Sequence, residues 1–226
     1  MNREEFEKSL LQPLRFWGDK DAAFVDSMLG TEAAAMVEYD QRNPHHCYDL
    51  FLHTLHTVNN LGEKSSILLK VAAFFHDIGK PAVAKEKDGR LVFYGHAKKS
   101  EEIASAILES LGYTDEEWQK IAFWIGHHDD FISWELPHED YGRKNPYLKV
   151  INRKTLDEYI NKLKLQLDKA DNELFGLLEQ LLKLCIADAS AQADEVVMKG
   201  SIVDTRENKI LKLREIQKVL EDWHKN

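Results

Sequence analysis

Apolar residues recur at helical spacing along most of the chain, and strand-like alternation is confined to short stretches. Leu55, Val58 and Leu61 lie three residues apart, as on one face of a helix. A glycine at position 62 then ends the pattern, as is common after a helix C-terminus. The spacing predicts helices over residues 2–12, 19–40 (broken at Gly30), 47–61, 65–80, 97–111, 114–128, 153–166, 171–195 and 206–223. The chain is therefore expected to be all-α.

The predicted helix over residues 65–80 differs from the others because apolar residues cover nearly every side of it. A helix of this kind is buried rather than amphipathic. It runs directly into His76 and Asp77, so two polar side chains are expected at the end of a buried helix.

Two segments interrupt the helical pattern. Residues 82–95 contain a Lys-Asp-Gly-Arg sequence between short extended runs, which predicts a small turn or hairpin. Residues 131–150 contain two prolines and a glycine, and are expected to form a loop over one face. Arg143 and Lys144 in this loop can meet an anionic substrate, although a solvated loop is the favoured interpretation.

Composition narrows the classes of partner. The 226 residues carry a formal net charge of −9 and no long basic run, which disfavours binding to long nucleic acid. No secretory signal and no membrane-length apolar stretch is visible, so a cytoplasmic location without membrane contact is expected. The two cysteines, Cys47 and Cys185, sit among apolar residues and are expected to be buried, reduced thiols.

Polar residues within apolar helices mark the candidate chemistry. His53, His76, Asp77 and Asp188 are each embedded in apolar sequence. A buried carboxylate costs several kcal/mol unless it is paired or bound to a metal. In one interpretation Asp77 pairs with Lys80 and His76 is a core histidine. In the other, the two histidines and two aspartates share one divalent cation, for which imidazole and carboxylate are suitable ligands.

The ordered set of motifs resembles one known family. The motifs are Leu52-His53-Thr54, Phe75-His76-Asp77-Ile78-Gly79-Lys80, Gly95-His96, Gly126-His127-His128 and Ala187-Asp188. This order is similar to that of the HD-domain superfamily of metal-dependent phosphohydrolases. It is most like the branch comprising the HD domain of bacterial tRNA nucleotidyltransferases and related free-standing hydrolases.

The resemblance implies roles for particular residues. His53, His76, Asp77 and Asp188 would bind a first ion, with Asp77 placed to bridge to a second. His96 and one histidine of the pair at 127 and 128 would hold that second ion. We favour His128, because it continues the apolar stripe of Ile121, Trp124 and Ile125. Lys80, beside the metal pair, and His46 would contact the substrate.

The resemblance also implies an HD-domain helical bundle and an activity. The expected division is an N-terminal helical extension (1–42), a hydrolase domain (43–195) and a C-terminal helix packed on it (196–226). With one or two divalent ions such as Mn²⁺, Fe²⁺, Mg²⁺ or Ni²⁺, the domain would hydrolyse a small phosphate ester. A nucleotide or cyclic nucleotide is the favoured substrate. Two alternatives are an HD-type di-iron oxygenase and a non-catalytic domain that binds a nucleotide. The oligomeric state cannot be predicted.

Overall fold

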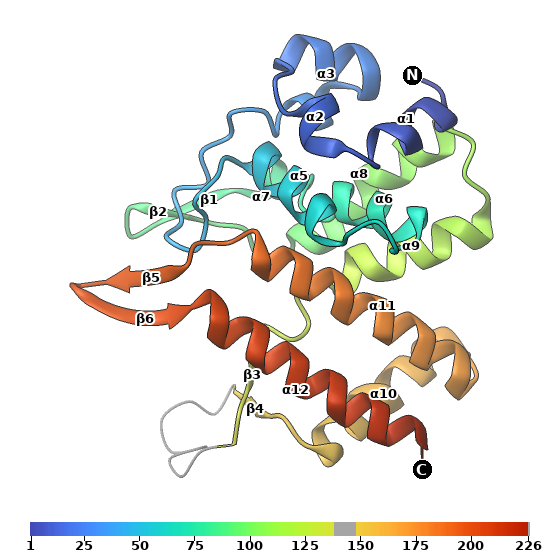
Figure 1. The fold of residues 1–226 in the computed structure, drawn as a ribbon, viewed down its shortest axis with the longest axis vertical. Helices are drawn as coiled ribbons and strands as arrows, with labels where there is room; N and C mark the ends of the chain where they lie inside the picture. Colours follow the sequence, from blue (N-terminus) through green and yellow to red (C-terminus); the bar gives the residue numbers. More distant parts are fainter. Residues whose placement is uncertain (138–147, 226) are drawn as a thin grey trace.

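The computed structural model describes residues 1–137 and 148–225, and the chain folds as a bundle of helices (Figure 1). The helices are α1 (Arg3–Ser9), α2 (Pro13–Trp17), α3 (Ala22–Leu29), α4 (Thr31–Ala34), α5 (Leu50–Asn60), α6 (Ile67–Phe75), α7 (Lys80–Val83), α8 (His96–Ser110), α9 (Asp115–His127), α10 (Arg153–Leu167), α11 (Asp171–Ser190) and α12 (Arg206–Lys225). Short strands form the pairs β1 (Lys85–Lys87) with β2 (Arg90–Val92), β3 (Trp134–Glu135) with β4 (Lys149–Val150), and β5 (Glu195–Met198) with β6 (Ser201–Thr205). The predicted all-α class and the hairpin within residues 82–95 are confirmed.

Side-chain caps set where several helices begin. The Asp49 carboxylate accepts a hydrogen bond from the Leu52 amide at the start of α5. Thr114 and Glu117 form a reciprocal capping box at the start of α9. Such caps satisfy amide groups that have no partner inside the helix. They fix the start of α5, which carries His53, and the start of α9, which ends directly before His128.

An aromatic cluster joins the N-terminal helices to the centre of the bundle. Phe6 of α1 and Trp17 of α2 are fully buried, and their rings lie 5.3 and 5.7 Å from the ring of Phe74. Phe51 of α5 packs edge-on against the same Phe74 ring. Aromatic pairs at these separations add to the stability gained from burial. The first helices therefore share the core on which α5 and α6 are packed.

The buried helix is shorter than the sequence predicts. It ends at Phe75, and residues 76–79 form a turn that leads into the short helix α7. At this turn Gly79 packs against α8, where its amide donates to the buried hydroxyl of Ser100. A β-carbon on Gly79 would lie 2.5 Å from the backbone nitrogen of Ser100. Helical periodicity continues through the turn, so it could not reveal this break.

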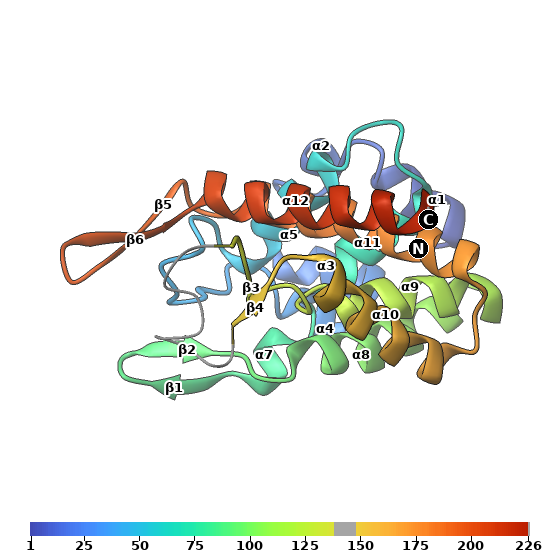
Figure 2. The ribbon, with the colours of Figure 1, turned by 90° about the horizontal axis from the view of Figure 1, so that it is seen from below.

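The C-terminal helices lie antiparallel and are joined by a hairpin that projects from the bundle (Figures 1 and 2). The helix predicted over 171–195 ends at Ser190, and the hairpin of β5 and β6 was not predicted. Its turn is at Lys199 and Gly200, both with positive φ, which suits a tight two-residue hairpin. Within the described ranges, no helix has both the length and the apolar character required to cross a membrane.

Candidate metal centre

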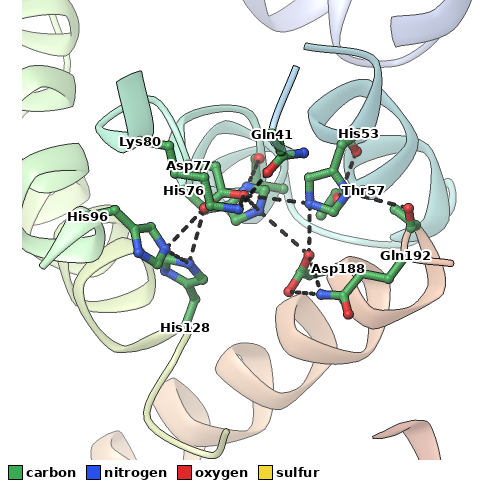
Figure 3. Close-up of polar contacts among 12 residues, drawn as sticks. Gln41, His53, Thr57, His76, Asp77, Lys80, His96, His128, Asp188 and Gln192 are labelled. Atoms are coloured by element: carbon green, nitrogen blue, oxygen red, sulfur yellow. Dashed lines mark hydrogen bonds and ion pairs between the residues drawn. The ribbon is translucent and has the colours of Figure 1, made fainter. Parts of the chain in front are cut away.

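Five segments bring polar side chains together at the centre of the bundle (Figure 3). His53 lies within α5, His76 and Asp77 follow α6, and Asp188 lies near the end of α11. His96 is the first residue of α8, and His128 directly follows α9. All of these side chains are buried except that of Asp188, which is 17 % exposed.

Two overlapping groups of possible ligand atoms meet at Asp77. On one side, His53 Nε2 lies 2.9 Å from Asp188 Oδ1, and His76 Nε2 lies 3.2 Å from Asp77 Oδ2. On the other side, Asp77 Oδ1 lies 3.1 Å from His96 Nε2 and 3.6 Å from His128 Nε2. The two carboxylate oxygens of Asp77 thus face different pairs of histidines, which is the arrangement needed to bridge two cations.

The histidine rings are oriented by the backbone. The Nδ1 atoms of His53, His76 and His128 lie 3.3, 2.7 and 2.7 Å from carbonyl oxygens. His96 Nδ1 lies 2.9 Å from the Phe93 carbonyl. Because a carbonyl only accepts, each Nδ1 carries a proton, and Nε2 is the atom left to act as a ligand. In every case Nε2 is the atom that faces the centre.

The charges at this centre compensate one another. Burial lowers the pKa of His76, but Asp77 and Asp188 outweigh this effect and raise it to about 10. Burial also raises the pKa of the Asp77 carboxyl, yet His76 and Lys80 hold it well below its ordinary value. Asp77 and Asp188 therefore keep their negative charge, and a positive charge beside them is favoured, whether proton or cation.

A cation suits the donor atoms better than protons alone. Within residues 1–137 and 148–225, His53 Nε2, His76 Nε2 and Asp77 Oδ1 are buried without a hydrogen bond of good geometry, despite nearby charged atoms. The Nε2 atoms of His96 and His128 lie only 3.0 Å apart, and both are acceptors when neutral. Imidazole and carboxylate together suit first-row divalent ions. The residues present therefore fit one or two such ions.

The two histidines after α9 point in different directions. His128 Nε2 faces His96 and Asp77, whereas His127 Nδ1 lies 2.7 Å from Asp130 Oδ2, away from this group. The apolar stripe on α9 predicts the same choice of His128. The assignment of His128 as a metal ligand stays a prediction.

A pair of alanine variants tests that assignment. His128→Ala is expected to lower the number of bound Mn²⁺ ions from two to one, because the second site loses one of its two imidazoles. His127→Ala is the matched control and should retain both ions. Calorimetric titration of the metal-free proteins measures the stoichiometry. Two ions bound by His128→Ala would exclude His128 as a required ligand, and a single ion bound by both the parent protein and His128→Ala would reject the dinuclear site.

The sequence left open an interpretation in which Lys80 pairs with Asp77, and the structure contains this ion pair. Its Nζ lies 2.7 Å from Asp77 Oδ2 and 3.0 Å from Gln41 Oε1, and the residue is 6 % exposed. The ion pair is therefore present at the edge of the candidate centre. Gln41 had no sequence signal, because it lies in a segment without periodicity. Contact between Lys80 and a substrate stays a prediction.

His46 also borders the centre. Its ring packs edge-on against that of His53, with 4.9 Å between centroids, and its Nδ1 is buried without a hydrogen-bond partner among the described residues. Burial lowers the pKa of His46 to about 2, and the positive charge of Lys80 adds to this effect. His46 is therefore neutral and can accept or donate a hydrogen bond towards the cleft.

A cleft of about 600 Å³ opens onto these residues. The residues that line it include Asp77, Asp188, His96 and His128, together with Lys80 and His46. Several other residues that line it were not singled out in the sequence: Tyr94, Asp129, Ile132, Gln192, Lys209 and Lys212. Asp129 Oδ2 lies 3.3 Å from His96 Nε2, so this carboxylate adds a possible ligand beside the second group. Asp129 could not be singled out from the sequence, because a second aspartate follows it at position 130.

Two residues of a loop and two cysteines were also singled out in the sequence. Arg143 and Lys144 lie outside the described residues. Cys185 is buried as expected, with its Sγ 3.2 Å from the His128 carbonyl. Cys47 is exposed, so the prediction of a buried thiol was wrong there. It precedes the first turn of α5 rather than lying within the helix, and its apolar neighbours in sequence do not surround it in space.

Comparison with known proteins gives two matches. The family model described as "HD domain" matches residues 45–174, more than half of the chain. The CC-adding tRNA nucleotidyltransferase of Thermus thermophilus is 31 % identical over 155 residues, which cover 65 % of this chain and 34 % of that protein. The chain thus spans about a third of the length of this relative. The family match includes every candidate ligand except Asp188, which lies beyond its last residue.

Proposed function

Because the chain belongs to the HD superfamily of metal-dependent phosphohydrolases, we propose that it hydrolyses a small phosphate ester, such as a nucleotide or a cyclic nucleotide. The observation that carries this proposal is the position of Asp77. Its two oxygens face separate pairs of imidazoles whose Nε2 atoms all point inwards.

The residues divide naturally into two sets of ligands. In this proposal His53, His76, Asp77 and Asp188 hold the first ion. Asp77, His96 and His128 hold the second, with Asp129 as a further candidate ligand. Bound divalent ions supply hydroxide from water near neutral pH and neutralise charge on the phosphoryl group. The backbone carbonyls that accept from Nδ1 keep each imidazole in the tautomer that ligation needs.

Two residues at the edge of the centre would act on the substrate. The ammonium group of Lys80 lies 2.7 Å from Asp77. In this position it can also donate a charge-assisted hydrogen bond to a phosphoryl oxygen of the substrate. Neutral His46 can hydrogen bond to the substrate without adding charge. Neither residue has to move a proton in this scheme, and their part is to bind and orient the phosphate.

The rim of the cleft supports a nucleotide rather than a bare phosphate ester. Tyr94 and Ile132 both line the cleft and are 75 % and 79 % exposed. Large apolar side chains left in solvent at a cleft mouth suit contact with a planar base. The net charge of −9 opposes the approach of a long polyanion, whereas a mononucleotide carries few charges beyond the metal centre.

Metal analysis followed by a substrate panel tests the proposal. We expect protein purified without chelator to contain a divalent metal. With Mn²⁺, Mg²⁺, Ni²⁺ or Fe²⁺ supplied, it should hydrolyse nucleoside monophosphates or 2′,3′-cyclic nucleotides more efficiently than an unstructured oligonucleotide. Preference for the oligonucleotide would contradict the argument from charge. Oxygen consumption by iron-loaded protein, without hydrolysis of any ester, would identify an oxygenase instead.

A further inference from the structure

A lysine of the C-terminal helix lies in the same cleft as the candidate metal centre. Lys209 belongs to the first turn of α12, which lies outside the family match. It lines the cleft, and its side chain is 16 % exposed. Its Nζ lies 2.9 Å from His45 Nδ1 and 2.8 Å from Gln192 Oε1. These contacts hold the ammonium group in place while part of it still faces the cleft.

Among the residues described, no carboxylate lies at hydrogen-bond distance from the ammonium group of Lys209. Burial lowers the pKa of His45, and Lys209 lowers it further, so this imidazole is neutral. Gln192 is neutral as well. The nearest carboxylate oxygen, on Asp204, is 3.8 Å away, which is beyond hydrogen-bond distance.

Among the described residues, Lys80 and Lys212 also line the cleft, and they differ in this respect. Lys80 lies 2.7 Å from Asp77 Oδ2, and Lys212 lies 3.0 Å from Glu135 Oε1. Each of them has a carboxylate at hydrogen-bond distance. Of the three lysines that line the described part of the cleft, Lys209 is therefore the one whose charge is most available to an incoming anion.

Lys209 is also close to the metal centre. Gln192 donates from Nε2 to the carboxylate of Asp188, at 3.3 and 3.4 Å, and accepts at Oε1 from Lys209. A single amide group thus separates the lysine from a candidate metal ligand. An anion bound by Lys209 would lie beside a phosphoryl group bound at the ions.

We propose that Lys209 binds a second phosphate group, carried by the leaving group of the substrate. The inference rests on the proposed function and narrows the substrate to doubly phosphorylated small molecules. In the reaction, a water oxygen forms a bond to the scissile phosphorus, and the bond from phosphorus to the leaving oxygen breaks. The leaving oxygen keeps the bonding electrons. In an ester it takes up a proton from the attacking water and departs as an alcohol, whereas in an anhydride it departs as a phosphate oxygen and the proton is released. The other product is inorganic phosphate.

Three adenine nucleotides isolate the effect of the second phosphate. ADP and adenosine 3′,5′-bisphosphate each release AMP as the phosphorylated leaving group, whereas AMP releases adenosine. We expect the protein to show a kcat/KM for ADP or the bisphosphate at least about 10-fold above that for AMP. A charge-assisted contact to a second phosphate can contribute an effect of about this size.

Substitutions then assign the preference to Lys209. Lys209→Gln should lower kcat/KM for the preferred substrate about 10- to 100-fold, mainly through KM, and leave AMP hydrolysis nearly unchanged. Lys209→Arg should retain part of the preference because it keeps the charge. Lys218→Gln, on the exposed side of the same helix, is the matched control and should behave as the parent protein. Thermal melting checks that each variant is folded.

Binding measurements separate this inference from the proposed function. Non-hydrolysable α,β-methylene-ADP should bind more tightly than AMP to the parent protein, and Lys209→Gln should remove the difference. If no ester is hydrolysed, the proposed function fails, yet this binding test still decides the role of Lys209. The inference is overturned if neither doubly phosphorylated substrate is preferred, or if the preference survives in Lys209→Gln.

Discussion

Replacing Asp77 with asparagine is expected to lower kcat/KM by roughly a thousand-fold or more and to abolish binding of both ions. A bound metal contributes several kcal/mol to hydrolysis, and each 1.36 kcal/mol corresponds to about a factor of ten. Asp77 is the residue shared by the two groups of imidazoles, so replacing its carboxylate with an amide disturbs both groups of ligands. Asparagine keeps the shape of the side chain while removing its charge.

Metal content and hydrolysis are measured on the same preparations of Asp77→Asn and the parent protein. Asp157→Asn is a suitable control because Asp157 is a surface carboxylate, 41 % exposed and paired with Arg153 on α10. It should keep full metal content and activity. Circular dichroism checks that Asp77→Asn is folded despite the loss of its ion pair with Lys80. Full turnover in Asp77→Asn would refute the proposed metal centre.

Replacing Gly79 with alanine is expected to destabilise the protein by about 1–3 kcal/mol, because the added methyl group has no space. Its β-carbon would lie 2.5 Å from Ser100 N and 2.8 Å from both His96 O and Lys99 C. All three are backbone atoms of α8, so no side chain can turn away to relieve the overlap. Since His96 begins that helix, displacement of α8 should also weaken binding at the second metal site.

Gly176→Ala is the matched control for this substitution. Gly176 lies within α11, and a β-carbon there would meet nothing within 4 Å. Alanine favours a helix over glycine, so this variant should gain up to about 1 kcal/mol. Urea unfolding measures the free energy of both variants. Equal stability of Gly79→Ala and the parent protein would show that α8 can shift at little cost.

The sequence predicted the helices and the set of buried polar residues well. Helical periodicity located most of the described helices to within a few residues, and the match to the HD domain confirms the resemblance. Histidines and aspartates within apolar helices are conspicuous because burial of such groups is costly. Their mutual distances were not available from the sequence, and their roles as ligands are still predictions.

What the sequence missed depends on contacts between distant segments. Lys209 lies on a helix with many charged residues, and nothing in its neighbours distinguishes it from a solvated lysine. Its proposed role depends on contacts with Gln192 and His45, which come from other parts of the chain. The hairpin of β5 and β6 was missed for a local reason, since its Lys-Gly turn is flanked by strands of only four and five residues.

The convergence of five segments on Asp77 has a consequence for the unfolded chain. His53 and Asp188 come from helices at opposite ends of the candidate domain, so an ion held by both would act as a non-covalent cross-link. Joining points far apart in sequence restricts an unfolded chain more than joining near neighbours does. Chain entropy would then oppose partial unfolding with the ion still bound. The bundle would release its metal and lose its structure as one cooperative event.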